Sequence, residues 1–102
     1  MARNLGDLMR LVIRSPEELG LVLRAVRKDS RVPLEDLALT VGVSRQTATN
    51  VELGQAKLST MIDFLREMGI ELSVGIPSSA HDRLERVTRQ AAARATRRRP
   101  RT

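Results

Sequence analysis

The sequence predicts a small, mainly α-helical domain, and three observations carry this prediction. Apolar residues recur at helical spacing in four successive stretches between residues 16 and 68. Pro, Gly and small polar residues separate these stretches, as they do at helix ends. Aromatic residues make up only 1% of the chain, so aliphatic side chains must fill the core. We predict a bundle of four to five helices with short terminal β-strands.

Two interpretations stay open for residues 5–14. One is a helical face formed by Leu5, Leu8, Met9 and Val12. The other is a strand in which apolar residues alternate with Arg10 and Arg14. We favour a short strand from about Met9 to Arg14, because β-branched residues lie next to a sharp boundary at residue 15.

The first helix is predicted to run from Pro16 to about Lys28. Ser15 is a good N-cap, Pro16 suits the first helical position, and Glu18 has the spacing of a capping box. Apolar residues at i, i+3, i+4 and i+7 predict one buried face, formed by Leu19, Val22, Leu23 and Val26.

Two short helices are predicted next, at residues 34–40 and 44–53. Gly42 lies between them, where the chain must turn sharply, and Ser44 caps the second helix. Pro33 pre-organises the entry to the first helix. The residues expected to face the core are Leu37, Ala38, Val41, Val43, Ala48 and Val51. This arrangement is the pattern of a helix-turn-helix.

A last helix is predicted from about Leu58 to Met68, and Gly69 ends it. Its expected buried residues are Leu58, Met61, Ile62, Leu65 and Met68. Residues 70–76, which follow this helix, give the best strand signal in the chain, because apolar and polar residues alternate. A lone strand needs a partner, either residues 11–13 of the same chain or the same strand of a second chain. The residues expected to support dimerisation are Ile70, Leu72, Val74 and Ile76.

Positive charge is concentrated at the C-terminal end. Residues 1–79 carry ten Lys or Arg and ten Asp or Glu, whereas residues 80–102 carry eight Arg and two acidic residues, so the net charge is +6. Leu84, Val87 and Ala91 mark a weak amphipathic helix, but the final Arg-rich residues should be disordered. The predicted divisions are an N-terminal arm (1–14), a helical domain (15–69), a dimerisation strand (70–77) and a basic, largely disordered tail (78–102).

Several classes of site lack the residues they need. The chain has no Cys, and His81, its single His, lies in a polar stretch where an exposed imidazole is expected. No carboxylate pair, activated nucleophile or Gly-rich phosphate loop is present. We therefore expect no enzyme activity, no metal site and no cofactor. No apolar run is long enough for a membrane span or a signal peptide, so a cytoplasmic protein is expected.

The outward residues of the second helix of the helix-turn-helix point to DNA. Arg45 can pair bidentately with guanine, and Gln46 or Asn50 can pair with adenine in the major groove. Phosphates are expected at the exposed amides that begin the helix at residue 34, and at Arg31 and Lys57. The candidate DNA-binding residues are Ser44, Arg45, Gln46, Thr47, Thr49, Asn50, Arg31 and Lys57.

Residues 19–65 resemble the Xre, or phage-repressor, type of helix-turn-helix. The motifs that carry the resemblance are Leu37-Ala38, Gly42-Val43-Ser44-Arg45-Gln46-Thr47 and Glu52-Leu53-Gly54. The resemblance implies a phage-repressor-like bundle, DNA binding, and an ion pair between Arg27 and Glu52. Two positions depart from the pattern: Pro33 stands where a capping Thr is usual, and Ala48 stands where a larger aliphatic residue is common.

The flanks make the chain similar to HipB-like antitoxins, the DNA-binding partners and repressors of HipA-type serine/threonine kinase toxins. This similarity covers roughly residues 11–76 and rests on the order of strand, Ser15-Pro16, helices, and the final segment from Gly69 to Val74. It implies that the last strand pairs with its symmetry mate in a homodimer. It also implies a HipA-type kinase as a partner.

The expected function is therefore that of a homodimeric repressor and antitoxin at a palindromic operator of double-stranded DNA. Its two recognition helices would lie about 34 Å apart, one turn of DNA. Two alternatives stay open. One is a free-standing Xre-family regulator without a toxin partner. The other is a basic architectural or RNA-associated protein in which the Arg-rich tail dominates binding.

Overall fold

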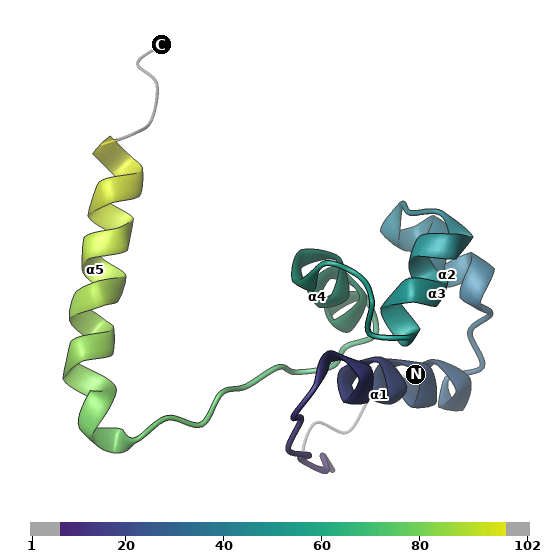
Figure 1. Cartoon of the computed structure of the whole chain (residues 1–102), viewed down its shortest axis with the longest axis horizontal. Helices are drawn as coiled ribbons and strands as arrows, with labels where there is room; N and C mark the ends of the chain where they lie inside the picture. Colours follow the sequence, from purple (N-terminus) through teal and green to yellow (C-terminus); the bar gives the residue numbers. More distant parts are fainter. Residues whose placement is uncertain (1–6, 98–102) are drawn as a thin grey trace. The chain divides into compact units, whose positions relative to one another are not determined.

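A computed structural model describes residues 7–97, so Leu5 and the final Arg residues lie outside the described part. The elements are α1 (Pro16–Asp29), α2 (Leu34–Val41), α3 (Arg45–Glu52), α4 (Leu58–Glu67), a short 3₁₀ helix (Ser78–Ala80) and α5 (His81–Arg97) (Figure 1). The chain forms two compact units, one that ends at Leu72 and one that begins at Ser73. The prediction of a mainly α-helical bundle is confirmed.

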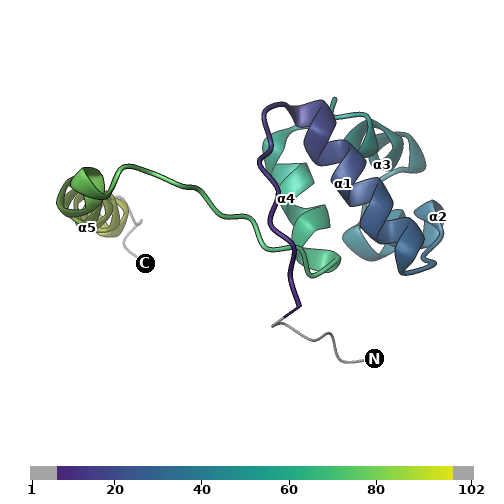
Figure 2. The ribbon, with the colours of Figure 1, turned by 90° about the horizontal axis from the view of Figure 1, so that it is seen from below.

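Helices α1 to α4 form the first unit and lie within one or two residues of their predicted bounds. Helix α1 packs against α3 and α4, and α2 packs against the same two helices (Figure 2). The capping box is formed in part. Ser15 Oγ accepts a hydrogen bond from the Glu18 amide at 3.1 Å, but the Glu18 carboxylate accepts from the Arg14 amide, one residue earlier than a capping box requires.

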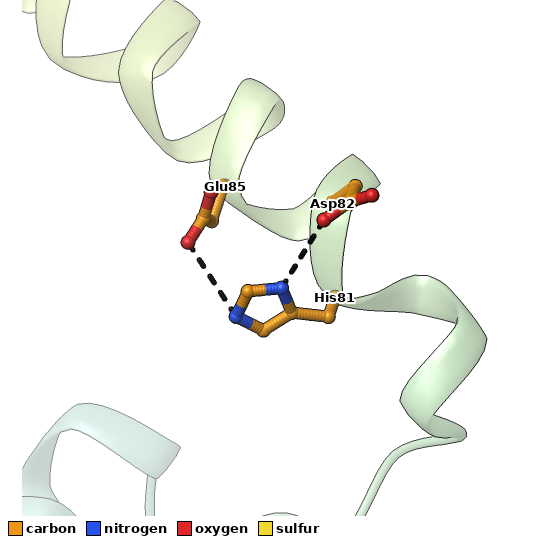
Figure 3. A group of neighbouring side chains, drawn as sticks. All are labelled: His81, Asp82 and Glu85. Carbon is orange, nitrogen blue, oxygen red and sulfur yellow. Dashed lines mark hydrogen bonds and ion pairs between the residues drawn. The ribbon is translucent and has the colours of Figure 1, made fainter.

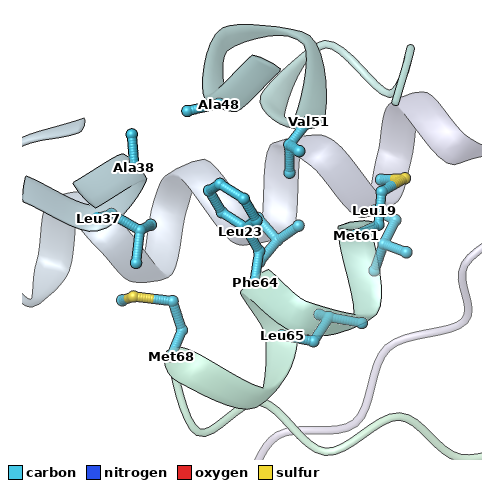
Figure 4. Close-up of a cluster of buried hydrophobic side chains, with 10 residues drawn as sticks. All are labelled: Leu19, Leu23, Leu37, Ala38, Ala48, Val51, Met61, Phe64, Leu65 and Met68. Carbon is cyan, nitrogen blue, oxygen red and sulfur yellow. The ribbon is translucent and has the colours of Figure 1, made fainter. Parts of the chain in front are cut away.

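Ten apolar side chains from these four helices form the core (Figure 4), namely Leu19, Leu23, Leu37, Ala38, Ala48, Val51, Met61, Phe64, Leu65 and Met68. Two predictions for α4 are corrected. Phe64, which the predicted face does not include, is 1% exposed and lies within the cluster. Leu58 is 63% exposed, because it begins α4 and its side chain lies one turn beyond the core.

The backbone of α1 packs directly against the backbone at the C-terminal end of α3. A Cβ atom on Gly20 would lie 2.4 Å from the Glu52 carbonyl oxygen, and one on Gly54 would lie 2.5 Å from the Glu17 amide nitrogen. Both contacts leave no room for a side chain. Gly20 was missing from the predicted core because a residue without a side chain contributes nothing to an apolar periodicity.

The ion pair between Arg27 and Glu52 joins the same two helices. Arg27 Nε donates to Glu52 Oε2 at 2.5 Å and Nη2 donates to Oε1 at 3.0 Å, while Nη1 donates to the Val32 carbonyl oxygen at 3.0 Å. The two side chains are only 12% and 9% exposed. The hydrogen bonds to Glu52 raise the pKa of the Arg27 guanidinium above its ordinary value, so Arg27 stays protonated.

The terminal strands are not formed within one chain. Residues 8–14 and 70–77 are irregular, so neither the helix nor the strand considered for the first segment is present there. An ion pair joins the two segments, between Arg10 Nη2 and Glu71 Oε1 at 3.6 Å. A strand needs a partner for its backbone groups. Pairing with a second chain therefore stays a prediction.

The structure also differs from the expectation of a largely disordered tail, since residues 81–97 form the helix α5. Ala and Arg, which dominate this segment, are strong helix formers. Asp82 in the first turn and Arg94 and Arg97 in the last turn complement the helix dipole. No helix in the described part of the chain combines the length and apolar character that crossing a bilayer requires.

Glu52→Gln should lower the free energy of unfolding by about 3 kcal/mol, because it leaves the mostly buried Arg27 charge without its counter-ion. Urea denaturation measures this loss. Asp63→Asn is the matched control: Asp63 lies 4.0 Å from Arg66 at an exposed position, so its loss should change stability by less than about 0.5 kcal/mol. Equal effects of the two substitutions would contradict a structural role for the buried pair.

Candidate DNA-binding surface

The turn between α2 and α3 is built by Gly42 and Ser44. Gly42 adopts a left-handed backbone conformation with φ 88°, and its amide donates to the Ala38 carbonyl oxygen at 2.8 Å. Ser44 Oγ then accepts from the Thr47 amide at 3.0 Å and caps α3. These local bonds set the direction of α3 as it leaves the turn.

Helix α3 has one buried and one outward face. Ala48 and Val51 are fully buried against the core. The predicted base-reading residues lie on the other side at positions i, i+1, i+4 and i+5 of the helix, namely Arg45, Gln46, Thr49 and Asn50. Arg45 and Gln46 are exposed, while Thr49 and Asn50 are half-buried. We call these four residues the α3 edge.

Two of the predicted contact residues are engaged in the cap. Ser44 Oγ donates to Thr47 Oγ1 at 3.0 Å, in addition to accepting the Thr47 amide. Their first role is therefore to begin the helix. Within the α3 edge, Gln46 Nε2 donates to Asn50 Oδ1 at 3.2 Å, which leaves Gln46 Oε1 and Asn50 Nδ2 available to a ligand. An acceptor and a donor side by side match the major-groove edge of adenine.

Arg45 is held by an acidic residue that the sequence analysis did not single out. Arg45 Nη1 lies 3.3 Å from Glu35 Oε1, and both side chains are largely exposed. Glu35 and Asp36 occupy the first turn of α2, where acidic residues favour the helix dipole. The acidic residues in the first turn of α2 can be recognised in the sequence. The closeness of Glu35 to Arg45 depends on how α2 and α3 pack.

The two predicted phosphate-binding side chains lie at the ends of other helices. Lys57 is exposed and is the N-cap of α4. Arg31 is exposed and adopts φ 59°, the left-handed conformation that usually selects Gly. The α1 end around it is a Schellman motif: the Arg31 amide donates to Lys28 O at 3.1 Å, and the Val32 amide donates to Arg27 O at 3.2 Å.

The start of α2 offers free amides but no capping side chain. Pro33 is its N-cap and forms no side-chain hydrogen bond, as expected from the missing Thr. The Pro33 carbonyl oxygen accepts from the amides of Asp36 and Leu37, at 3.1 and 3.2 Å. The two amides before them, those of Leu34 and Glu35, have no acceptor within the helix and lie at the positive end of the helix dipole.

One group of side chains in residues 7–97 has the composition of a metal site, His81, Asp82 and Glu85 in the first turn of α5 (Figure 3). His81 Nδ1 lies 3.3 Å from Asp82 Oδ1, and Nε2 lies 3.4 Å from Glu85 Oε1. All three side chains are exposed, and they come from one helical turn without support from a second element. We interpret the group as a solvated surface network.

No protein-family model and no curated protein matches this sequence. Several solved structures are similar to this chain. A HipB variant in an O2 20mer complex has a TM-score of 0.61 at 21% identity, over 69% of this chain and 100% of that chain. A HipB–O4 20mer complex has a TM-score of 0.60 at 21% identity, over 68% of this chain and 100% of that chain.

The fold is that of HipB. A HipA–HipB–O2–O3 complex gives the same result, with a TM-score of 0.61 at 21% identity, over 68% of this chain and 100% of that chain. The whole HipB chain is matched in each case. The matched share of this chain, 69%, is about the length of the unit that ends at Leu72.

Arg31→Gly should raise the free energy of unfolding by about 0.5–1 kcal/mol, because Gly removes the Cβ strain of the left-handed position. Arg24→Gly is the matched control. It removes the same charge from an exposed position inside α1 but lowers stability by about 1 kcal/mol, the ordinary cost of Gly in a helix. Thermal unfolding of both variants measures the difference, and destabilisation by Arg31→Gly would contradict the role of its backbone conformation.

Proposed function

We propose that this protein is a sequence-specific, DNA-binding transcriptional repressor. The observation that carries the proposal is the α3 edge, since Arg45, Gln46, Thr49 and Asn50 share the outward side of a short helix whose opposite side is buried. An α-helix fits the major groove, and these side chains carry the donors and acceptors that distinguish base pairs. The helix-turn-helix is thus suited to base recognition in DNA rather than to catalysis.

Around the α3 edge, the phosphate backbone would be bound by Arg31, Lys57 and the free amides that begin α2. Such contacts position a protein on the duplex but do not read its sequence. Arg45 would exchange Glu35 for guanine, which costs little because an exposed ion pair is worth less than about 1 kcal/mol. Binding to an operator would place the protein in the bacterial cytoplasm, at the nucleoid.

We further propose a homodimer that binds a palindromic operator. The apolar members of the predicted strand beyond Ile70 are exposed: Leu72, Val74 and Ile76 are 52%, 80% and 47% exposed. Exposed aliphatic residues on an alternating segment favour pairing with the same segment of a second chain. The pairing would set the distance between two α3 edges at one turn of DNA, about 34 Å.

The HipA–HipB–O2–O3 complex supports a further proposal, that this protein is the antitoxin and autoregulator of a toxin–antitoxin module. Its partner would be a HipA-type serine/threonine kinase. The alternative is a free-standing Xre-family regulator. Co-purification with a kinase encoded beside its gene favours the antitoxin, whereas purification without one favours the free-standing regulator.

Arg45→Ala and Gln46→Ala should each weaken binding to the correct operator by about 1–3 kcal/mol and leave binding to a scrambled duplex nearly unchanged, because each removes a base contact. Gel-shift titrations at fixed salt, with both duplexes, measure the two affinities. Equal losses on the two duplexes would contradict base reading by these residues.

Glu35→Gln provides the contrasting variant for this experiment. It removes a carboxylate that lies beside Arg45 and repels phosphate, so binding to both duplexes should strengthen. If Glu35→Gln binds both duplexes more tightly while Arg45→Ala loses affinity only for the operator, a general effect of charge is distinguished from base recognition.

Val74→Pro should shift the protein from dimer to monomer in sedimentation velocity, because Pro removes a backbone donor from the strand. Val74→Thr is the control, since it keeps the amide and the β-branched shape and should remain dimeric. An unchanged dimer in Val74→Pro would place the interface elsewhere.

A further inference from the structure

Helix α5 carries a row of positive charge that the proposed function does not use. Its members are Arg83, Arg86, Arg89, Arg94 and Arg97, which we call the Arg face. At 100° per residue these side chains leave the helix within an arc of about 140°. All five are exposed, and none takes part in an ion pair among the described residues.

The two acidic residues of α5 do not neutralise the Arg face. Asp82 and Glu85 lie in the first two turns, and both contact His81. Beyond Glu85 the helix contains no acidic residue, so its last three turns are purely basic. A row of guanidinium groups without counter-ions is a strong site for phosphate groups.

The chain before α5 carries no net positive charge. Residues 1–79 carry ten basic and ten acidic residues, and the one Arg of the α3 edge is paired with Glu35. Sequence-independent affinity for DNA comes from basic side chains that release counter-ions from phosphates. Arg31 and Lys57 would each add a single phosphate contact, whereas the excess of basic over acidic side chains among the described residues lies in α5.

We propose that the Arg face of α5 binds the phosphate backbone of duplex DNA without reading its sequence. The proposal rests on the proposed function for the choice of duplex DNA as ligand. From Arg83 to Arg97 the helix rises about 21 Å. One DNA strand carries about six phosphates over that length. Five guanidinium groups therefore meet a comparable number of phosphates.

Two other classes of ligand fit the helix less well. Helices that bind membrane surfaces carry several large apolar residues, often aromatic, opposite the basic face. Here the opposite face holds only Leu84 and Val87 among Thr and Ala residues. Single-stranded nucleic acid is bound by aromatic stacking, and the single aromatic residue, Phe64, is buried in the core. Binding to the backbone of a duplex requires only positive charge on the helix, which the Arg face supplies.

Phosphate binding would also stabilise α5. Arg83, Arg86 and Arg89 are spaced three residues apart, so like charges lie close on the helix surface and repel. Because α5 buries none of its residues, packing adds little to its stability. Phosphates bound along the Arg face remove the repulsion, so amide hydrogen exchange in α5 should slow when the full-length protein binds duplex DNA.

The test compares the full-length protein with a variant in which all five Arg residues of the Arg face are changed to Gln. Gln keeps helix propensity and removes the charge. Fluorescence anisotropy with a scrambled duplex of about 20 base pairs gives the dissociation constant between about 50 and 200 mM salt. The slope of log affinity against log salt should fall by up to about 4.5, and affinity at the lowest salt by at least about tenfold. An unchanged slope and affinity would overturn the proposal.

Three controls separate this proposal from others. Changing the same residues to Lys should preserve most of the slope, because Lys also neutralises phosphate. The double variant Arg45→Ala with Gln46→Ala should keep the slope even if it loses operator preference, so failure of the α3 edge and failure of the Arg face are distinguishable. Tighter binding to an RNA duplex than to DNA, or charge-dependent binding to phosphatidylserine vesicles without binding to duplex, would overturn the assignment.

Discussion

The contact between α1 and the C-terminal end of α3 is the constraint on which the other features of the first unit depend. The bidentate pair of Arg27 and Glu52 holds the last residue of α3, and Gly20 allows the two backbones to touch beside it. A mostly buried charge pair is stable only when both partners are present and hydrogen-bonded. Arg27 also donates to Val32, so the same side chain fixes the chain as it leaves α1.

This constraint explains how a helix of eight residues can present side chains at defined positions. Helix α3 is too short to be stable alone, but it is fixed at its start by the Ser44 cap and at its end by Glu52. Between these points Ala48 and Val51 lock one face to the core. The outward side chains therefore start from a rigid backbone, which is what a specific site requires.

The two compact units differ in their electrostatics. The first unit balances its charges, and at the α3 edge it pairs Arg45 with Glu35. A balanced surface favours selective contacts, since it lacks a general attraction for phosphate. The second unit has the opposite character, with exposed Arg residues along α5 and no buried residue between positions 73 and 97. Under our proposals the first unit supplies specificity, and α5 supplies charge-dependent affinity.

The sequence by itself determined the local features of this protein. Helix ends at Ser15, Gly42 and Ser44 follow from backbone geometry and hydrogen bonds that span four residues or fewer. The α3 edge was equally predictable, because outward and buried faces follow from helical periodicity once Ala48 and Val51 are assigned to the core. The ion pair needed more than periodicity and came from a family resemblance.

Only the tertiary structure decided which groups meet across elements. The burial of Gly20, the exposure of Leu58 and the closeness of Glu35 to Arg45 depend on how helices cross, which no local pattern encodes. The segments predicted as strands remain irregular in a single chain, because a strand is defined by its partner. Sequence specifies each element through contacts along the chain, whereas packing specifies the contacts between elements.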